Sequence, residues 1–167
     1  LPTWALSNHD TQRVPTRLGG LAKARALALV THALPGSVYV FQGEELGLSD
    51  AEMPAHARRD PIFLRSSGAQ LGRDGCRVPL PWSGIAPPYG FSSEGVDTWL
   101  PQPDNWGALS VEAQGADDLS VLSQYRSTLA ARKEFADHRE LTWIEWRDLP
   151  RVLAFSRGDI TVVANTS

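Results

Sequence analysis

The 167-residue sequence contains a single cysteine, Cys76, so no disulfide can form within it. It has no apolar run that approaches the ~18 residues of a membrane-spanning helix. Acidic and basic residues are mixed along the chain, the net charge is −3, and no basic stretch stands out. These absences argue against a membrane partner and a nucleic-acid partner. The lone cysteine fits a reducing compartment, and we expect a cytoplasmic location.

The composition is that of a globular protein, with 42% hydrophobic and 21% charged residues. The length suffices for one ordinary domain with a sizeable core. No internal repeat or low-complexity tract is evident. The chain starts at Leu1, close to a strand-like run, and ends in another strand-like run, "DITVVANTS". We therefore expect a piece of a longer protein.

The first part of the sequence predicts a strand, a helix and a second strand. Trp4–Ser7 and "SVYVF" (Ser37–Phe41) have the short apolar and β-branched character of buried strands. Between them, Arg17–Leu34 is rich in Ala and Leu, with Thr16 as expected N-cap and Pro35-Gly36 as the stop. This order predicts a βαβ unit with parallel strands. The apolar stripe of the helix is expected at Leu18, Ala22, Ala26, Leu29, Val30 and Ala33.

Each expected strand is followed directly by polar residues. Asn8-His9-Asp10 follows the first strand, and Gln42-Gly43-Glu44-Glu45 follows the second. Because ligands bind at the carboxyl ends of parallel strands, both clusters are candidate site segments. Glu44 and Glu45 are adjacent and would point to opposite faces of a strand, so we expect them to be structural.

An irregular, proline-rich stretch follows, from about residue 48 to residue 116. Loops of this length are uncommon in compact domains and are usually functional or disordered. Its aromatic residues argue for order. Each of them has loop packing as the ordinary interpretation, but Tyr89 and Trp99 are also candidates for stacking on a sugar ring. The aromatic residues concerned are Trp82, Tyr89, Trp99 and Trp106.

The last part of the sequence predicts a helix and then an antiparallel sheet. Asp118–Glu134 has helical spacing, with Asp117 or Asp118 as the expected cap. "LTWIEW", "RVLAFSR" and "DITVVAN" are strand candidates joined by short turns. A change of layer type near residues 136–140 predicts two domains, 1–136 and 137–167. The helix stripe is expected at Leu119, Leu122, Tyr125 and Leu129.

Four motifs occur in an order that resembles the α-glucosidases of the α-amylase superfamily, glycoside hydrolase family 13. They are "LSNHD", "FQGEELGL", "RRDPIF" and "GRDGCRVPLPW", and "WLPQPDNW" fits bacterial members. The resemblance covers nearly the whole chain. It implies an α/β fold: residues 1–136 would be the C-terminal part of a (β/α)8 TIM barrel, with strands seven and eight, the long loop and the last helix. Residues 137–167 would be the start of an antiparallel β-domain, cut short at the end.

The resemblance also implies roles for individual residues. Asp10 would be the catalytic carboxylate that stabilises the transition state, and His9 would bind the same sugar. Arg77 would close the pocket and make the enzyme exo-acting, although Arg73 lies one motif position away in a similar setting. The nucleophile and the acid/base belong to strands four and five, outside these residues. The chain alone is therefore expected to be inactive, with the missing N-terminal part of its own barrel as its partner.

The expected activity is retaining hydrolysis of terminal α-linked glucose from short oligosaccharides, without a cofactor or a metal. A transglycosylase or sugar isomerase on the same scaffold, forming trehalose or isomaltulose, is an alternative. A non-catalytic barrel that serves as an interaction domain is another. At residue level, Asp10 could be a turn or N-cap residue, and His9 a structural histidine. Cys76 has no evident partner, so we expect an inert buried thiol, and no spacing near His9 suggests a metal site.

Overall fold

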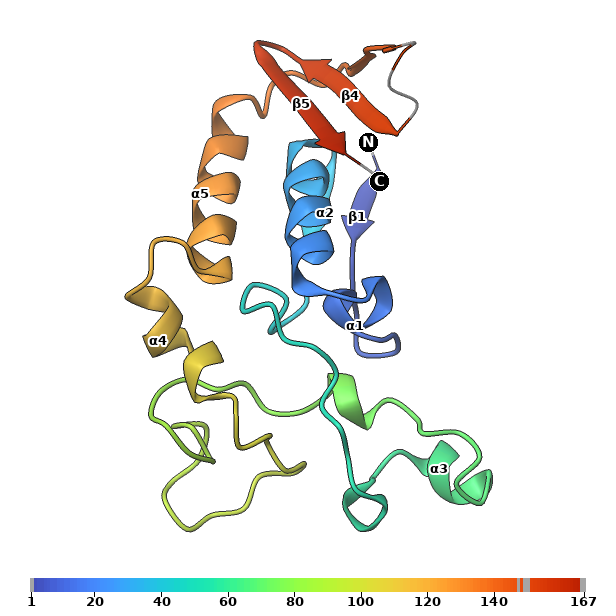
Figure 1. Cartoon of the computed structure of the whole chain (residues 1–167), viewed down its shortest axis with the longest axis vertical. Coiled ribbons are helices and arrows are strands. Elements are labelled where there is room, and N and C mark those ends of the chain that lie inside the picture. The colour runs from blue at the N-terminus through green and yellow to red at the C-terminus, as the bar shows by residue number, and fades with distance from the viewer. Residues whose placement is uncertain (1, 147, 149–150, 166–167) are drawn as a thin grey trace.

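The N-terminal part of the chain forms a βαβ unit, as predicted. The computed structural model describes residues 2–146, 148 and 151–165. Strand β1 (Thr3–Ala5) pairs in parallel with β2 (Ser37–Tyr39), with Trp4 opposite Val38. Helices α1 (Val14–Leu18) and α2 (Leu21–Ala33) connect them. In Figure 1, α2 lies beside β1 and α5 lies on the other side of α2.

The connecting helix is broken where the sequence predicted one continuous helix. Gly19 and Gly20 have φ values of +70° and +154°, which residues other than glycine rarely adopt, and these two glycines separate α1 from α2. Gly20 is the N-cap of α2, so the expectation that Thr16 would cap it is wrong. Thr16 lies inside α1, where its Oγ1 accepts a hydrogen bond from the Asp50 N–H at 2.7 Å. The expected stop at Pro35-Gly36 is confirmed, because α2 ends at Ala33.

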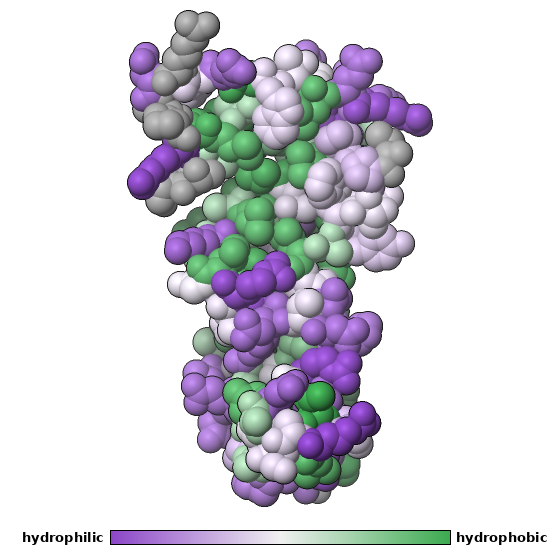
Figure 2. All heavy atoms as spheres, turned by 90° about the vertical axis from the view of Figure 1, so that its right-hand side faces the viewer, coloured by the Kyte–Doolittle hydropathy of each residue, from purple (hydrophilic) through white to green (hydrophobic). Residues whose placement is uncertain are grey.

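The burial of α2 and of the two strands differs from the prediction. Leu29 of the expected stripe is 46% exposed, whereas Ala28 is fully buried against Val121 and Tyr125. In β2, Tyr39 is 65% exposed. Figure 2 shows apolar side chains gathered over the part of the molecule where β1 lies in Figure 1. The buried residues of α2 are Ala24, Ala28, Thr31, His32 and Ala33.

The long loop after β2 is ordered around its own apolar core. It contains α3 (Pro61–Arg65), α4 (Val111–Gly115) and short 3₁₀ turns at Ala55–Ala57, Asp74–Cys76 and Gly107–Leu109. Tyr89 is 1% exposed and its hydroxyl donates to the Pro103 carbonyl at 2.9 Å, so it is a core residue and not a stacking surface. The core residues of this region are Leu46, Leu48, Ala51, Met53, Val78, Leu80, Tyr89, Leu100, Trp106 and Leu122.

Helix α5 (Val121–Glu134) starts three residues later than predicted. Its cap is Ser120, whose Oγ accepts from the Ser123 N–H at 3.1 Å, and not Asp117 or Asp118. Asp117 instead accepts from the Leu119 N–H at 2.8 Å, which forms a turn before the helix. This turn leaves Leu119, expected in the buried stripe, 80% exposed.

A three-stranded antiparallel sheet follows, with the order β3 (Thr142–Trp143), β4 (Val152–Arg157), β5 (Ile160–Asn165). The expected strands at residues 141–146, 151–157 and 159–165 are present in shorter form. Arg157 Nη1 donates to the carbonyls of Ala33 at 3.0 Å and Leu34 at 3.1 Å. Arg132 donates to the Leu34 carbonyl at 2.6 Å. Arg132 and Arg157 thus bind the negative C-terminal end of α2. Because Arg157 belongs to β4, it also connects the sheet to the helix.

Candidate active site

The Asn8-His9-Asp10 cluster forms a tight turn directly after β1. Asn8 Oδ1 accepts from the Asp10 N–H at 2.8 Å, and the Thr11 hydroxyl lies 3.4 Å from the same oxygen. An asparagine side chain that binds the backbone two residues later is a common turn-forming arrangement. Asn8 therefore shapes the turn, and the side chains of His9 and Asp10 are 69% and 51% exposed.

Two arginines from the long loop converge on Asp10. Arg73 Nη1 donates to Asp10 Oδ1 at 2.7 Å, and Arg77 Nη2 donates to the same oxygen at 3.0 Å. Arg77 Nε also donates to the His9 carbonyl at 2.8 Å. The hydrogen bond from Arg73 is the main reason why the pKa of Asp10 is below its usual value, and the positive neighbours add to it. The predicted residues Asp10, His9 and Arg77 are thus brought together, and so is Arg73.

Among the described residues, no arginine binds the second carboxylate oxygen of Asp10. Asp10 Oδ2 lies 3.4 Å from His9 Nε2. A charged carboxylate and an imidazole therefore face the same exposed space at the carboxyl end of a parallel strand. Both can form hydrogen bonds with hydroxyl groups.

Comparison with known proteins places this arrangement in a family. Residues 1–140 match the family model described as "Alpha amylase, catalytic domain". The chain belongs to the α-amylase catalytic-domain family. The resemblance predicted from the sequence motifs is thereby confirmed at the level of the family.

Several curated members of the α-amylase family are similar in sequence. A probable α-glucosidase of Rhizobium meliloti (strain 1021) is 40% identical over 135 residues, which are 78% of this chain and 24% of that protein. Trehalose-6-phosphate hydrolase of Escherichia coli (strain K12) is 34% identical over 164 residues, 85% of this chain and 29% of that protein. The chain thus spans between 24% and 29% of the length of these two relatives.

Solved structures of the family are similar in fold. The crystal structure of the α-glucosyl transfer enzyme XgtA matches with a TM-score of 0.82 and 38% identity, over 97% of this chain and 31% of that one. Trehalulose synthase MutB from Pseudomonas mesoacidophila MX-45 matches with a TM-score of 0.80 and 25% identity, over 99% of this chain and 34% of that one.

The family motifs "RRDPIF" and "GRDG" supply an anchor for Arg73 that the sequence interpretation missed. Asp60 is 3% exposed, and its Oδ2 accepts from Arg73 Nε at 2.6 Å and from the Arg73 N–H at 3.0 Å. Its Oδ1 accepts from the Ile62 N–H at 3.1 Å, so Asp60 also caps α3. Asp74, 2% exposed, accepts from the backbone N–H groups of Arg59 and Asp60.

The electrostatics of Asp60 follow from these contacts. The hydrogen bonds from Arg73 hold the pKa of Asp60 far below its usual range, and Asp60 in turn raises the pKa of Arg73. The signal in the sequence was an Asp directly before Pro61, since Asp is a preferred N-cap and Pro a preferred first helical residue.

Arg13 is buried and joins the segment after β2 to the 3₁₀ turn at Asp74–Cys76. It is 1% exposed, and its guanidinium donates to the carbonyls of Gln42 at 2.7 Å and Cys76 at 2.8 Å. A Cβ atom at Gly43, whose φ is +83°, would lie 2.7 Å from Arg13 Nη1, so a glycine is required there. Cys76 is 2% exposed and burial raises the pKa of its thiol, which agrees with the expected inert thiol.

The carboxylate of Glu44 lies away from the Asp10 turn. It is 5% exposed and accepts from the Ser7 hydroxyl at 3.1 Å and the Tyr125 hydroxyl at 3.0 Å. Burial raises its pKa. These contacts suit the structural role that the sequence predicted.

Metal-binding groups and membrane-spanning helices are both absent from the described part of the chain. Within it, no group of three or more His, Cys, Asp or Glu side chains is placed to hold a metal ion. None of the helices in residues 2–146, 148 and 151–165 has the length and apolar character needed to cross a membrane.

Proposed function

We propose that the complete protein carrying this chain is a retaining α-glucosidase that removes terminal α-linked glucose from short oligosaccharides. In this proposal, residues 1–136 are the last part of a (β/α)8 barrel and residues 137–167 begin a C-terminal β-domain. The observation that carries the proposal is the exposed Asp10 carboxylate, fixed by Arg73 and Arg77 at the carboxyl end of a parallel strand. Family membership and the similar α-glucosidase support it.

The geometry suits a carboxylate that stabilises charge instead of moving protons. Retaining glycosidases pass through an oxocarbenium-like transition state, and hydrogen bonds to sugar hydroxyls that strengthen there contribute several kcal/mol. Asp10 is ionised because of its arginine neighbours, and they fix Oδ1 while Oδ2 stays available for hydroxyls. Asp10 therefore holds the sugar at the moment when positive charge develops on the ring. The nucleophile and the acid/base are supplied by strands outside these 167 residues.

His9 and Arg77 take supporting roles in the same site. The exposed imidazole of His9 donates to the hydroxyls that Asp10 also binds. Arg77 is fixed at two points, on Asp10 and on the His9 carbonyl, and its planar group closes the end of the pocket. A closed end admits only a terminal glucose, which makes the enzyme exo-acting. We propose a short oligosaccharide as substrate and the cytoplasm as location.

Glucosyl transfer is the second candidate. It is favoured by the similarity to XgtA, an α-glucosyl transfer enzyme, at 38% identity, and to the trehalulose synthase MutB. Both reactions begin with binding of the same glucosyl unit, and they differ in the molecule that accepts it, which is water in hydrolysis and a second sugar in transfer. Chromatography of the products from sucrose and maltose separates the two, since hydrolysis gives free glucose and transfer gives new oligosaccharides or isomers.

The decisive experiment measures glucose release from maltose, isomaltose and sucrose by the complete protein. Asp10→Asn keeps the size of the side chain but removes its charge, and we expect kcat to fall by about 10²–10³-fold with little change in KM. Asp159→Asn, in the exposed turn between β4 and β5, is the matched control and should retain full activity. Absence of any product from the unmodified protein would refute the enzymatic function and favour a non-catalytic barrel.

A further inference from the structure

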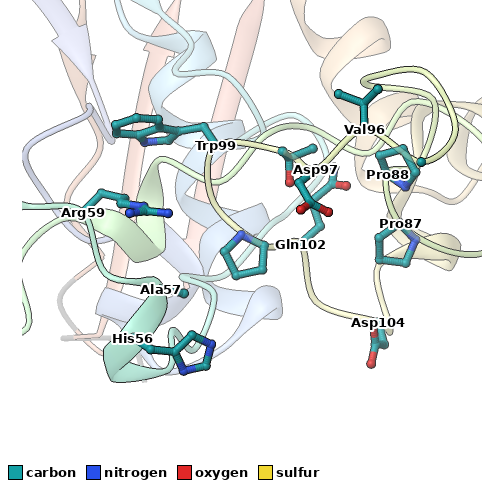
Figure 3. Close-up of a pocket in the computed structure, with 13 residues that line it drawn as sticks. His56, Ala57, Arg59, Pro87, Pro88, Val96, Asp97, Trp99, Gln102 and Asp104 are labelled. Carbon is teal, nitrogen blue, oxygen red and sulfur yellow. The ribbon is translucent and has the colours of Figure 1, made fainter.

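A cleft of about 560 Å³ lies in the long loop, apart from the Asp10 cluster. Figure 3 shows it between the segment that carries His56 and Arg59 and the segment that carries Pro87 and Pro88. None of Asp10, Arg73 and Arg77 belongs to its lining. The cleft is therefore separate from that cluster.

The wall of the cleft combines one open aromatic face with charged groups. Trp99 is 69% exposed, and the guanidinium of Arg59 lies 6.0 Å from its ring centroid. Asp97 and Asp104 add carboxylates to the lining. A sugar ring suits such a wall, because it offers an apolar C–H face to the indole and hydroxyls around its edge to the charged groups.

Gln102 is a rigid polar residue in the wall of the cleft. It lines the cleft and is only 6% exposed. Its Nε2 donates to the carbonyls of Pro79 at 3.1 Å and Leu80 at 3.3 Å, which fixes the orientation of the amide. Its Oε1 is buried and has no hydrogen-bond partner among the described residues. The two hydrogen bonds of the amide therefore fix this part of the wall.

The cleft is connected to the Asp10 cluster by direct contacts. The side chain of Arg59 lines the cleft, while its backbone N–H donates to Asp74 Oδ2 at 2.8 Å. The next residue, Asp60, holds Arg73, which reaches Asp10. One short segment thus shapes a wall of the cleft and anchors the candidate active site.

We propose that this cleft binds a glucosyl unit of an oligosaccharide, stacked on Trp99, at a site separate from the one that holds the reacting sugar. The identity of the ligand rests on the proposed function, since an α-glucosidase meets such saccharides as substrate. Such a site would bind a second glucosyl unit of a longer oligosaccharide.

The test is saturation-transfer difference NMR of maltotriose with the complete protein, in the presence of excess glucose-shaped iminosugar. The iminosugar occupies the site of the reacting sugar, so the part of the remaining maltotriose signal that depends on Trp99 reports the cleft. We expect a clear signal from the unmodified protein and at least a fivefold loss in Trp99→Ala. Trp99→Tyr, which keeps an aromatic face, should restore most of the signal. Trp82→Ala is the matched control, because Trp82 is 47% exposed in the same loop but does not line the cleft.

The outcomes separate this proposal from the proposed function. A maltotriose signal that is absent from the unmodified protein, or equal in Trp99→Ala and Trp82→Ala, overturns the saccharide site. A Trp99-dependent signal supports the site even if the protein releases no glucose, in which case only the enzymatic function fails. Melting curves of the three variants show whether each remains folded.

Discussion

Burial has opposite outcomes for the charge of ionisable side chains in two regions of the molecule. In the long loop, Asp60 is 3% exposed and stays charged, because Arg73 binds it and holds its pKa far below the usual range. Between the helices, Glu44 is 5% exposed, yet its pKa is raised. His32 is 2% exposed and contacts the ring of Tyr125 edge-on, and its pKa is lowered to about 4. Burial there favours the neutral form of both groups.

The difference lies in the partners and not in the depth of burial. Asp60 accepts hydrogen bonds from a guanidinium and from backbone N–H groups, which compensate its charge. Glu44 accepts from two hydroxyls, which do not outweigh its desolvation. For His32, desolvation is the main cause and the charge of Arg132 adds to it. The loop therefore keeps Asp60, Arg73 and Asp10 charged and linked by hydrogen bonds, whereas burial favours the neutral forms of Glu44 and His32.

The largest expected effect comes from removing the charge of Asp60. Asp60→Asn has nearly the same shape but turns an amide toward Arg73, so we expect a loss of about 3 kcal/mol of stability. Because Arg73 loses its anchor, kcat/KM should also fall by roughly tenfold. Thermal melts and glucose release from the complete protein measure the two effects. Asp118→Asn, at an exposed position, is the control; equal behaviour of the two variants would contradict a charged anchor.

A smaller effect is expected from the titration of His32. Its pKa is about 4 in the fold and near 6.5 when unfolded, so the unfolded state binds more protons between these values. Stability should therefore fall as the pH drops, by about 2 kcal/mol from pH 7 to pH 5. His32→Gln should flatten this part of the curve in urea unfolding at each pH, whereas His56→Gln, at an exposed position, should not. An unchanged slope in His32→Gln would show that other groups cause the dependence.

The smallest effect is expected at Glu44. Glu44→Gln resembles the protonated form that burial already favours, so stability should change by less than about 1 kcal/mol at pH 7. Because its pKa is raised, Glu44 binds more protons in the folded state than in the unfolded state. The stability of the unmodified protein therefore falls as the pH rises above the unfolded pKa of Glu44. A glutamine side chain cannot ionise, so Glu44→Gln should not show this fall. Any gain in stability of Glu44→Gln over the unmodified protein should vanish near pH 4. A loss as large as that of Asp60→Asn, in the same melting assay, would remove the contrast between the two regions.

Local sequence patterns predicted the elements better than their faces. The end of α2 was predicted correctly because its determinants, Pro35 and Gly36, lie within a few residues of it. The break at Gly19-Gly20 and the Ser120 cap were missed, although glycine and serine are both common at such positions. The exposure of Leu29 could not be predicted, because the buried face of α2 packs against residues of α5, which lie about 90 residues later in the chain.

The candidate site likewise has residues that the sequence predicted and one that it did not. The sequence motifs were sufficient to group His9, Asp10 and Arg77 in one site, whereas they indicated no role for Asp60. Asp60 and Arg73 are separated by a full loop in sequence, and their pairing depends on Asp74 holding the backbone of residues 59 and 60. A hydrogen bond across such a distance leaves no periodic signal in the residues.

By itself, the sequence determined the order of the elements, the family and the residues that meet at the end of β1, since these depend on local propensity and on short motifs. The tertiary structure decided which groups remain charged and which face of each helix is buried. It also decided that Tyr89 enters the core while Trp99 stays 69% exposed at a cleft. The reason is physical: pKa and burial depend on which atoms surround a group, and most of those atoms come from distant segments.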